Sequence, residues 1–347
     1  MIAVSHLSLL FSACATAFVL STVATPLVRE AAVRMGWLDR PETDVKTHPV
    51  PVPALGGVAI WLGYAGALVA TRFLTTFPTG TLYRLRGILA GAALVFVLGV
   101  IDDLKKPQGL NWKLKMAVQV LAALVLVHFD IRIRFIHPDY VGTALTLFWV
   151  VGITNAVNII DIMDGLAASQ AAAAALGFWL ISLPSEDLYV NFAAAALLGA
   201  ALGFLPWNFS KKRKIFMGDS GSTLLGFTLS ALALGTDFTL VNPLGVYAPL
   251  LILAVPMYDT FYVMAVRLVQ GKSPFLGSRD HFALRMERLN FTRHQIVGLT
   301  SLASFFLVLC AWLVTLVPTA WAVAIYLVLG GWIAFVTYHI SQVDMSR

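Results

Sequence analysis

Long apolar segments recur along the whole chain, and they decide what it can fold into. A bilayer core about 30 Å thick is crossed by roughly 20 helical residues, and eleven apolar segments approach that length. Only 12% of the 347 residues are charged and the mean hydropathy is +0.82, whereas soluble proteins carry roughly 25% charged residues. We therefore expect an all-α polytopic membrane protein with one integral-membrane domain over residues 1–347. The predicted spans are 7–28, 53–71, 87–101, 114–129, 141–158, 165–183, 189–207, 220–236, 243–266, 295–317 and 319–340.

The basic residues indicate how these spans are oriented. Arg29 and Arg34 follow the first span and no basic residue precedes it, the reverse of the charge order in a cleavable signal peptide. We therefore expect a retained helix with its N-terminus outside and, after eleven crossings, a cytoplasmic C-terminus. This orientation places 19 of the 24 lysines and arginines on the cytoplasmic side, as the positive-inside rule requires. The net charge of +6, to which the run Lys211 to Lys214 contributes, is then mostly explained by the membrane topology and indicates no nucleic-acid partner.

Five aspartates lie at the ends of predicted spans, all on the predicted cytoplasmic side. Carboxylates this close to hydrocarbon are costly unless they are paired or solvated, so they are functional candidates; solvated helix ends are the alternative. Adjacent residues of a helix point in different directions, so the first two acids are expected to have separate roles. The five are Asp102, Asp103, Asp161, Asp164 and Asp219.

Asn155, Asn158, Asp161 and Asp164 recur at three-residue steps, a spacing that keeps side chains near one face of a helix. Such a strip offers amide and carboxylate oxygens, which are the ligands that Mg²⁺ prefers. The alternative is a polar helix end whose side chains only cap loose carbonyl groups.

Residues 216–221, Phe-Met-Gly-Asp-Ser-Gly, predict a tight turn into a helix. Asp219 or Ser220 would lie near the N-cap, and the glycines would let a ligand approach the backbone. Capping alone is the alternative explanation for Asp219.

Basic residues accompany these acids. Lys113 and Lys115 open the fourth span and can neutralise phosphate oxygens as point charges, unless they only reflect topology. The longest basic loop, 268–294, contains Arg279 and Arg285, whose guanidinium groups suit a diphosphate. No Walker-type loop, dinucleotide-binding glycine motif or Ser-His-Asp triad is recognisable. The combination indicates metal-assisted transfer that involves phosphates at the cytoplasmic surface of the membrane.

Several motifs, in order along nearly the whole chain, resemble the polyprenyl-phosphate N-acetylhexosamine-1-phosphate transferases. That family includes the phospho-N-acetylmuramoyl-pentapeptide transferases and the undecaprenyl-phosphate GlcNAc-1-phosphate transferases. The resemblance rests on Asp39-Arg40-Pro41, Lys46 to His48, Leu55-Gly56-Gly57, 99–104, 155–165, 216–221 and the 268–294 loop, which is expected to be a cytoplasmic substrate loop.

The resemblance implies a Mg²⁺-dependent enzyme, with Mn²⁺ as the alternative metal, in the cytoplasmic membrane of a bacterium. The phosphate of undecaprenyl phosphate would attack the β-phosphorus of a UDP-sugar at the cytoplasmic face, and UMP would leave. By the same resemblance, this reaction would be the first membrane step of cell-envelope glycan synthesis. The resemblance leaves both a one-step route and a covalent intermediate open, and it suggests a homodimer.

The same resemblance implies roles for particular residues. Asp102 and Asp103 would form the catalytic centre, where one of them deprotonates or orients the lipid phosphate. Asn158 and Asp219 would hold the metal. The implied substrate-binding residues are Lys46, His48, Lys113, Lys115, Asp161, Asp164, Gly165, Phe216, Gly218, Arg279, His281 and Arg285.

The chain departs from the family's usual motifs at three places. Ile162 stands where glycine is usual, Ala54 stands where many members have arginine, and His281 alone remains of a histidine cluster. The last departure favours a GlcNAc-type donor over the MurNAc-pentapeptide donor, which is the second choice, and Arg279 or Arg285 would then replace the lost phosphate contact. A catalytically silent scaffold and a proton-coupled transporter are further alternatives. The retained acids argue against the scaffold, and their place at span ends argues against the transporter.

Overall fold

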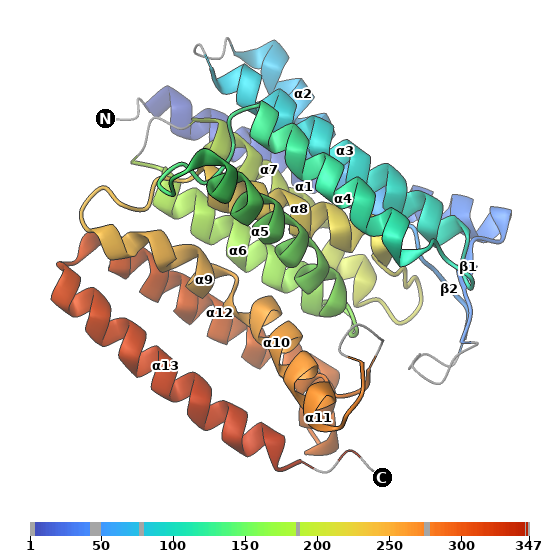
Figure 1. The fold of residues 1–347 in the computed structure, drawn as a ribbon. Helices are drawn as coiled ribbons and strands as arrows, with labels where there is room; N and C mark the ends of the chain where they lie inside the picture. The colour runs from blue at the N-terminus through green and yellow to red at the C-terminus, as the bar shows by residue number, and fades with distance from the viewer. Residues whose placement is uncertain are drawn as a thin grey trace.

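The computed structural model of the chain describes residues 4–41, 50–75, 80–184, 188–273, 278–343 and 345. Over this part the chain is mostly helical, and its long helices lie alongside one another as a bundle (Figure 1). The predicted all-α, polytopic membrane architecture is confirmed. The elements are α1 (Val4–Met35), β1 (Leu38–Asp39), β2 (Val52–Pro53), α2 (Gly56–Leu74), α3 (Thr81–Leu104), α4 (Trp112–His128), α5 (Asp139–Ile159), α6 (Leu166–Ser182), α7 (Leu188–Asn208), α8 (Gly218–Gly235), η1 (Pro243–Tyr247), α9 (Ala248–Ile252), α10 (Ala254–Val269), α11 (Phe282–Arg288), α12 (Arg293–Leu316) and α13 (Thr319–Ser341).

The number of membrane crossings is less sharply defined than the helices themselves. Within the described ranges, seven helices are long and apolar enough to cross a membrane, or eight if the bent pair Pro243–Ile252 and Ala254–Val269 forms one span. Each of the eleven predicted spans overlaps one helix or this bent pair. The shortfall comes from shorter or more polar helices: α4 and α6 have 17 residues each, and α8 opens with a polar turn. The count of eleven therefore stays a prediction.

Helices α6, α7 and α8 form the interior of the bundle, and small side chains make this possible. The runs Ala171–Ala175 and Ala193–Ala196 are buried, and small residues let helices approach closely where lipid supplies no hydrophobic drive. In the most apolar 18-residue stretch of α7, 83% of the residues are buried, whereas the corresponding share in α13 is 11%. Helix α13 lies at the edge of the bundle (Figure 1), so its outward side chains are placed to face lipid.

One end of the bundle gathers the loops that form a polar site. Strands β1 and β2 pair antiparallel, with Leu38 opposite Pro53. The segment before α8 continues this ribbon, because the Phe216 N–H donates to the Pro53 carbonyl (2.8 Å) and the Phe216 carbonyl accepts the Gly56 N–H (2.9 Å). The entrance to α8 is thereby fixed against the start of α2. The 71° bend between α9 and α10 leads the chain through α10 to α11 at this same end (Figure 1).

Candidate active site

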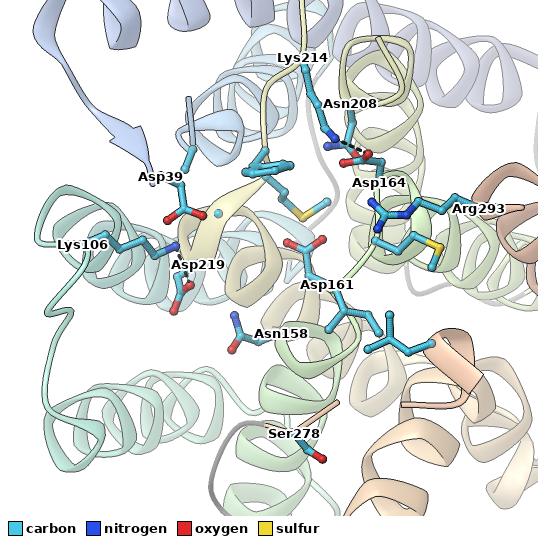
Figure 2. Close-up of a pocket in the computed structure, with 17 residues that line it drawn as sticks. Asp39, Lys106, Asn158, Asp161, Asp164, Asn208, Lys214, Asp219, Ser278 and Arg293 are labelled. Carbon is cyan, nitrogen blue, oxygen red and sulfur yellow. Dashed lines mark ion pairs between the residues drawn. The ribbon is translucent and has the colours of Figure 1, made fainter. Parts of the chain in front are cut away.

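A pocket of about 290 Å³ opens among these loops, and most of its lining side chains are polar (Figure 2). Its walls come from β1, from the segment after α3, from the ends of α5 and α7 with the segments that follow them, and from the starts of α8, α11 and α12. The polar residues that line it are Asp39, Lys106, Asn158, Asp161, Asp164, Asn208, Lys214, Asp219, Ser278 and Arg293. Residues far apart in the sequence therefore form one polar chamber, as the motif positions predicted.

Asp103, at the end of α3, holds the first turn of α8. Its carboxylate accepts the backbone N–H groups of Asp219 and Ser220, each at 2.9 Å. The N-cap residue of α8, Met217, offers no side-chain cap, so Asp103 supplies from another helix what a local cap usually supplies. Gly218 has a φ of +73°, and a side chain there would collide with the Asp103 carboxylate. The alternative that capping alone explains Asp219 is therefore wrong.

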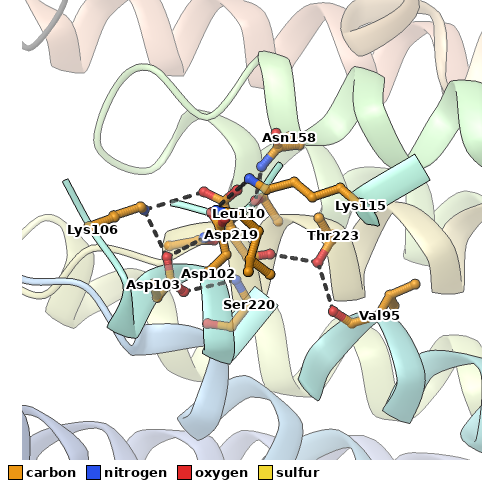
Figure 3. Close-up of polar contacts among 12 residues, drawn as sticks. Val95, Asp102, Asp103, Lys106, Leu110, Lys115, Asn158, Asp219, Ser220 and Thr223 are labelled. Carbon is orange, nitrogen blue, oxygen red and sulfur yellow. Dashed lines mark hydrogen bonds and ion pairs between the residues drawn. The ribbon is translucent and has the colours of Figure 1, made fainter. Parts of the chain in front are cut away.

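Two lysines connect three of the aspartates (Figure 3). The Lys115 ammonium lies 2.7 Å from both Asp102 Oδ2 and Asp219 Oδ2. The Lys106 ammonium lies 2.7 Å from Asp103 Oδ1 and 3.3 Å from Asp219 Oδ1. Burial lowers the pKa of Lys106, but the Asp103 and Asp219 carboxylates raise it by more. The pKa of Lys106 therefore lies above the usual lysine value, and the ammonium stays charged. Asp219 therefore lies between two fixed positive charges.

Asp102 and Asp103 point in different directions, as expected for neighbours on a helix. Asp102 Oδ1 accepts the Leu110 N–H at 2.6 Å, while its other oxygen meets Lys115. Helix α4, which carries Lys115, is capped by Asn111, whose side chain accepts the Lys113 N–H at 2.9 Å. The carboxylate of Asp102 thus ties the loop after α3 to the first turn of α4.

The predicted strip of asparagines and aspartates is only partly formed. Helix α5 ends at Ile159, so Asp161 and Asp164 lie on the following turn, and Asn155 is directed to Gln119 (Nδ2 to Oε1, 2.7 Å) instead of the pocket. Asn158 does reach the pocket and donates its Nδ2 to Ser222 Oγ at 2.8 Å. Among the described residues no partner of the Asn158 amide oxygen is found, and this oxygen can accept from a ligand or bind a cation.

Asp161 is a carboxylic acid whose negative charge Lys106 only partly compensates. Burial raises its pKa most, the Asp219, Asp164 and Asp103 carboxylates raise it further, and Lys106 opposes them; the resulting pKa is about 7. No ion pair to Asp161 is found among the described residues. A carboxyl group with so high a pKa, in a pocket with other acids, marks a place where additional positive charge would be stabilised.

The oxygen groups in the pocket are of the kinds that Mg²⁺ prefers as ligands. Asn158, Asp161 and Asp219 offer one amide and two carboxylates, and Mg²⁺ is usually held by one or two carboxylates together with substrate phosphates and waters. In the described part of the chain, no three His, Cys, Asp or Glu side chains converge as a complete metal site. Substrate oxygens would therefore have to supply part of the coordination.

Asp164 and Phe216 form another wall of the pocket with Lys214, a lysine that sequence reasoning set aside, and Gly165 follows Asp164 behind this wall's lining residues. Lys214 lies 2.5 Å from Asp164 Oδ2 and sits over the Phe216 ring, 5.1 Å from its centroid. The Gly165 N–H donates to Asn208 Oδ1 at 2.5 Å. Lys214 thus lines the pocket in addition to adding to the cytoplasmic charge, a position that its sequence context, a run of four basic residues, did not signal.

The predicted substrate residues of the 268–294 loop do not gather at the pocket. His281 is buried and its Nδ1 lies 2.6 Å from Asp259 Oδ2 of α10. Arg285 is buried as well and donates to the Val343 carbonyl at 2.7 Å, while Arg279 is exposed to solvent. From the described part of this loop, Ser278, Leu284 and Arg293 line the pocket in their place.

Other predicted residues have varied positions. Gly218 and Phe216 line the pocket with the acids. Lys113 is exposed and lies over the Trp112 ring, 5.9 Å from its centroid, outside the pocket lining. Lys46 and His48 lie outside the described residues. Lys106 and Arg293 line the pocket although sequence reasoning counted them only as cytoplasmic charge; the position of Lys106 three residues after Asp103 was the available signal.

Comparison with known proteins agrees with this arrangement. The family model described as "Glycosyl transferase family 4" matches residues 85–237, a stretch that contains all five aspartates. A "Probable undecaprenyl-phosphate N-acetylglucosaminyl 1-phosphate transferase" of Bacillus subtilis is 30% identical over 292 residues, covering 82% of this chain and 78% of the relative. A "Decaprenyl-phosphate N-acetylglucosaminephosphotransferase" of Mycobacterium tuberculosis is 34% identical over 320 residues, covering 81% and 76%. An "Undecaprenyl-phosphate alpha-N-acetylglucosaminyl 1-phosphate transferase" of Escherichia coli is 27% identical over 301 residues, covering 83% and 79%.

Proposed function

Because the chain belongs to glycosyl transferase family 4, we propose that it transfers N-acetylglucosamine 1-phosphate from UDP-GlcNAc to a polyprenyl phosphate such as undecaprenyl phosphate, with release of UMP. The names of the three relatives support the sugar phosphate and the lipid carrier. The reduced histidine motif around His281 supports the same donor class over a MurNAc-pentapeptide donor.

The observation that carries the proposal is the lysine bridge. Lys115 and Lys106 each contact Asp219 and one further acid at the end of α3. When a diphosphate enters, these ammonium groups have phosphate oxygens as additional partners, and lysine binds such oxygens as a compact point charge. Charges held in fixed positions beside the reacting phosphates are the usual source of rate enhancement in phosphoryl transfer.

Asp102 and Asp103 would then have different roles in the reaction. Asp103 is buried and its carboxylate is occupied by the first turn of α8, so its part is to position Asp219. Asp102 holds Lys115 through one oxygen and is the better candidate to orient or deprotonate the lipid phosphate. Mg²⁺, or Mn²⁺ in its place, would be held by Asn158 and Asp219 with Asp161 beside them, and when bound it would neutralise charge on the diphosphate and on the departing UMP.

We place this reaction at the cytoplasmic face of a bacterial cytoplasmic membrane. In support, the site lies at the end of the bundle where most of the basic loops are. The start of α1 and the end of α13 lie at opposite ends (Figure 1), which agrees with an odd number of crossings, eleven in our proposal. The whole chain would form one membrane domain, with 268–294 as its cytoplasmic substrate loop, and would assemble as a homodimer.

A panel of nucleotide sugars tests this function. Purified full-length protein is incubated with undecaprenyl phosphate, Mg²⁺ and one donor at a time: UDP-GlcNAc, UDP-GalNAc or UDP-MurNAc-pentapeptide. We expect UMP release with UDP-GlcNAc that stops when EDTA removes the metal. UMP release only with UDP-MurNAc-pentapeptide would show that the protein catalyses the peptidoglycan reaction instead. Folded protein that releases UMP from none of them would support the silent-scaffold alternative.

A further inference from the structure

We propose that Arg293 contacts the nucleotide-sugar donor and that Glu287 positions its guanidinium group. This inference rests on the proposed function, because the donor is the one named there. Arg293 is the first residue of α12 and follows Thr292, which caps that helix together with Gln295. The capping box fixes the start of the helix, so the arginine leaves the backbone at a defined point.

The guanidinium of Arg293 points into the pocket. Figure 2 shows it on the side away from Lys106 and Asp219, toward the wall that carries Asp164. Glu287 of α11 accepts a hydrogen bond from its Nε at 3.0 Å. The bond to Glu287 uses only the Nε–H of Arg293. In the described part of the chain, no protein partner is found for the two terminal NH₂ groups of this guanidinium. A guanidinium held this way presents a planar fork to a phosphate or carbonyl oxygen.

The other arginines near this loop are not placed to do this. Arg279 and Arg288 are exposed to solvent, and neither lines the pocket. Arg285 is buried, donates to the Val343 carbonyl and lies 3.3 Å from Asp280. Among the described residues, Arg293 is thus the one arginine on the pocket wall, and the one basic side chain that the described part of the 268–294 loop contributes to it.

The surroundings of Arg293 favour the donor over the lipid acceptor. The acceptor must keep its hydrocarbon tail in the bilayer, so only its phosphate reaches the chamber. The wall that Arg293 faces is built from the turn around Asp164, which also contributes Ile162 and Met163, and from the pre-α8 segment with Lys214. A nucleotide sugar has no hydrocarbon tail to keep in the bilayer, and its polar and ring groups suit these polar and apolar lining residues. Its oxygens would satisfy the fork, whereas a lipid phosphate would be taken up at the lysine bridge.

Equilibrium binding of UDP-GlcNAc to full-length protein, without acceptor, tests the inference directly. We expect Arg293→Ala to weaken binding at least 10-fold, Arg293→Lys to weaken it less, and Glu287→Gln to fall between wild type and Arg293→Ala. The matched control, Arg288→Ala, removes an exposed arginine of the same segment and is expected to bind like wild type. In turnover, the KM for UDP-GlcNAc should rise with the binding loss, while the KM for undecaprenyl phosphate stays within about 2-fold.

Two results would overturn the assignment of Arg293. Folded Arg293→Ala protein that binds UDP-GlcNAc as tightly as wild type would show that the arginine does not contact the donor. A rise in the KM for undecaprenyl phosphate alone would assign the contact to the acceptor. Wild-type protein that neither binds UDP-GlcNAc nor releases UMP would instead overturn the proposed function, and this inference with it.

Discussion

The carboxylate of Asp103 accepts the backbone N–H of Asp219 at 2.9 Å, so one acid of the cluster positions another. Asp103 lies at the end of α3 and Asp219 in the first turn of α8, 116 residues apart in the sequence. Its second oxygen takes the next N–H group, that of Ser220. The contact leaves the Asp219 side chain directed to the lysines and the pocket.

This contact predicts different outcomes for the two neighbouring acids. Asp103→Ala leaves two backbone N–H groups at the start of α8 without a partner, which costs about 1–3 kcal/mol of stability, and activity falls with it. Asp102→Asn keeps the shape of the side chain and should lose turnover with a smaller loss of stability. Thermal unfolding in detergent, paired with UMP release, separates the two. Equal losses of stability in both variants would contradict the division of roles.

Lys115 supports a second prediction. Its removal in Lys115→Ala leaves Asp102 and Asp219 without their shared cation, and we expect kcat/KM to fall about 100-fold, equivalent to about 2.7 kcal/mol. The control is Lys113→Ala, because Lys113 lies two residues earlier on the same helix but is exposed over the Trp112 ring, whereas Lys115 contacts Asp102 and Asp219. Its activity should stay within about 3-fold of wild type. A comparable loss of activity in Lys113→Ala would show that Lys113 contributes to substrate binding, as the sequence motif predicts.

The pKa of Asp161 predicts how stability depends on pH in the metal-free protein. Burial and neighbouring acids raise this pKa from 3.8 to about 7. Between about pH 4 and pH 7 the carboxyl group is therefore protonated in the folded protein but ionised in the unfolded chain. Stability should therefore fall as pH rises through this window, with a slope of at most about 1.4 kcal/mol per pH unit. Asp161→Asn should flatten the slope and raise stability at pH 8. Thermal unfolding from pH 5 to pH 8 checks this, and parallel curves for the two proteins would contradict it.

The buried pair Asp259–His281 predicts an energetic coupling outside the pocket. Asp259 also accepts the Phe282 N–H at 3.1 Å, so it anchors the loop that supplies Ser278 and Leu284 to the pocket wall. Replacing His281 by alanine leaves a buried carboxylate without its partner. We expect a double-mutant cycle with Asp259→Ala and His281→Ala to give a coupling of about 1 kcal/mol or more in unfolding experiments. Additive losses would show that the pair is not coupled.

The helices and the acids at their ends were predictable from the sequence for physical reasons. Apolar length specifies a crossing helix, and an aspartate at the end of such a helix is costly without a purpose. The pairings were not predictable, because Lys115 and Asp219 meet through the packing of α4 against its neighbours and not through spacing along the chain. The same holds for Lys214, whose role depends on the turn that carries Asp164.

Short helices explain the remaining difference from the sequence. Helix α6 is enclosed by α7, α8 and α12, so its 17 residues need not match a bilayer by themselves. The three-residue spacing from Asn155 to Asp164 predicted side chains near one face of a helix, but α5 stops at Ile159, close to the end of the predicted span at residue 158. The turn that follows leads to Gly165, which adopts a φ of +77°. Three-residue periodicity cannot reveal such a stop.

The chemical identity of the lipid product tests the central claim most directly. Wild-type protein and Asp219→Asn are incubated with UDP-GlcNAc, undecaprenyl phosphate and Mg²⁺, and the lipid and the nucleotide are both identified by mass spectrometry. We predict a GlcNAc joined to the lipid through a diphosphate, with one UMP per product, and neither compound from folded Asp219→Asn. A monophosphate-linked sugar with UDP as the released nucleotide, or near-normal product from Asp219→Asn, would contradict the claim.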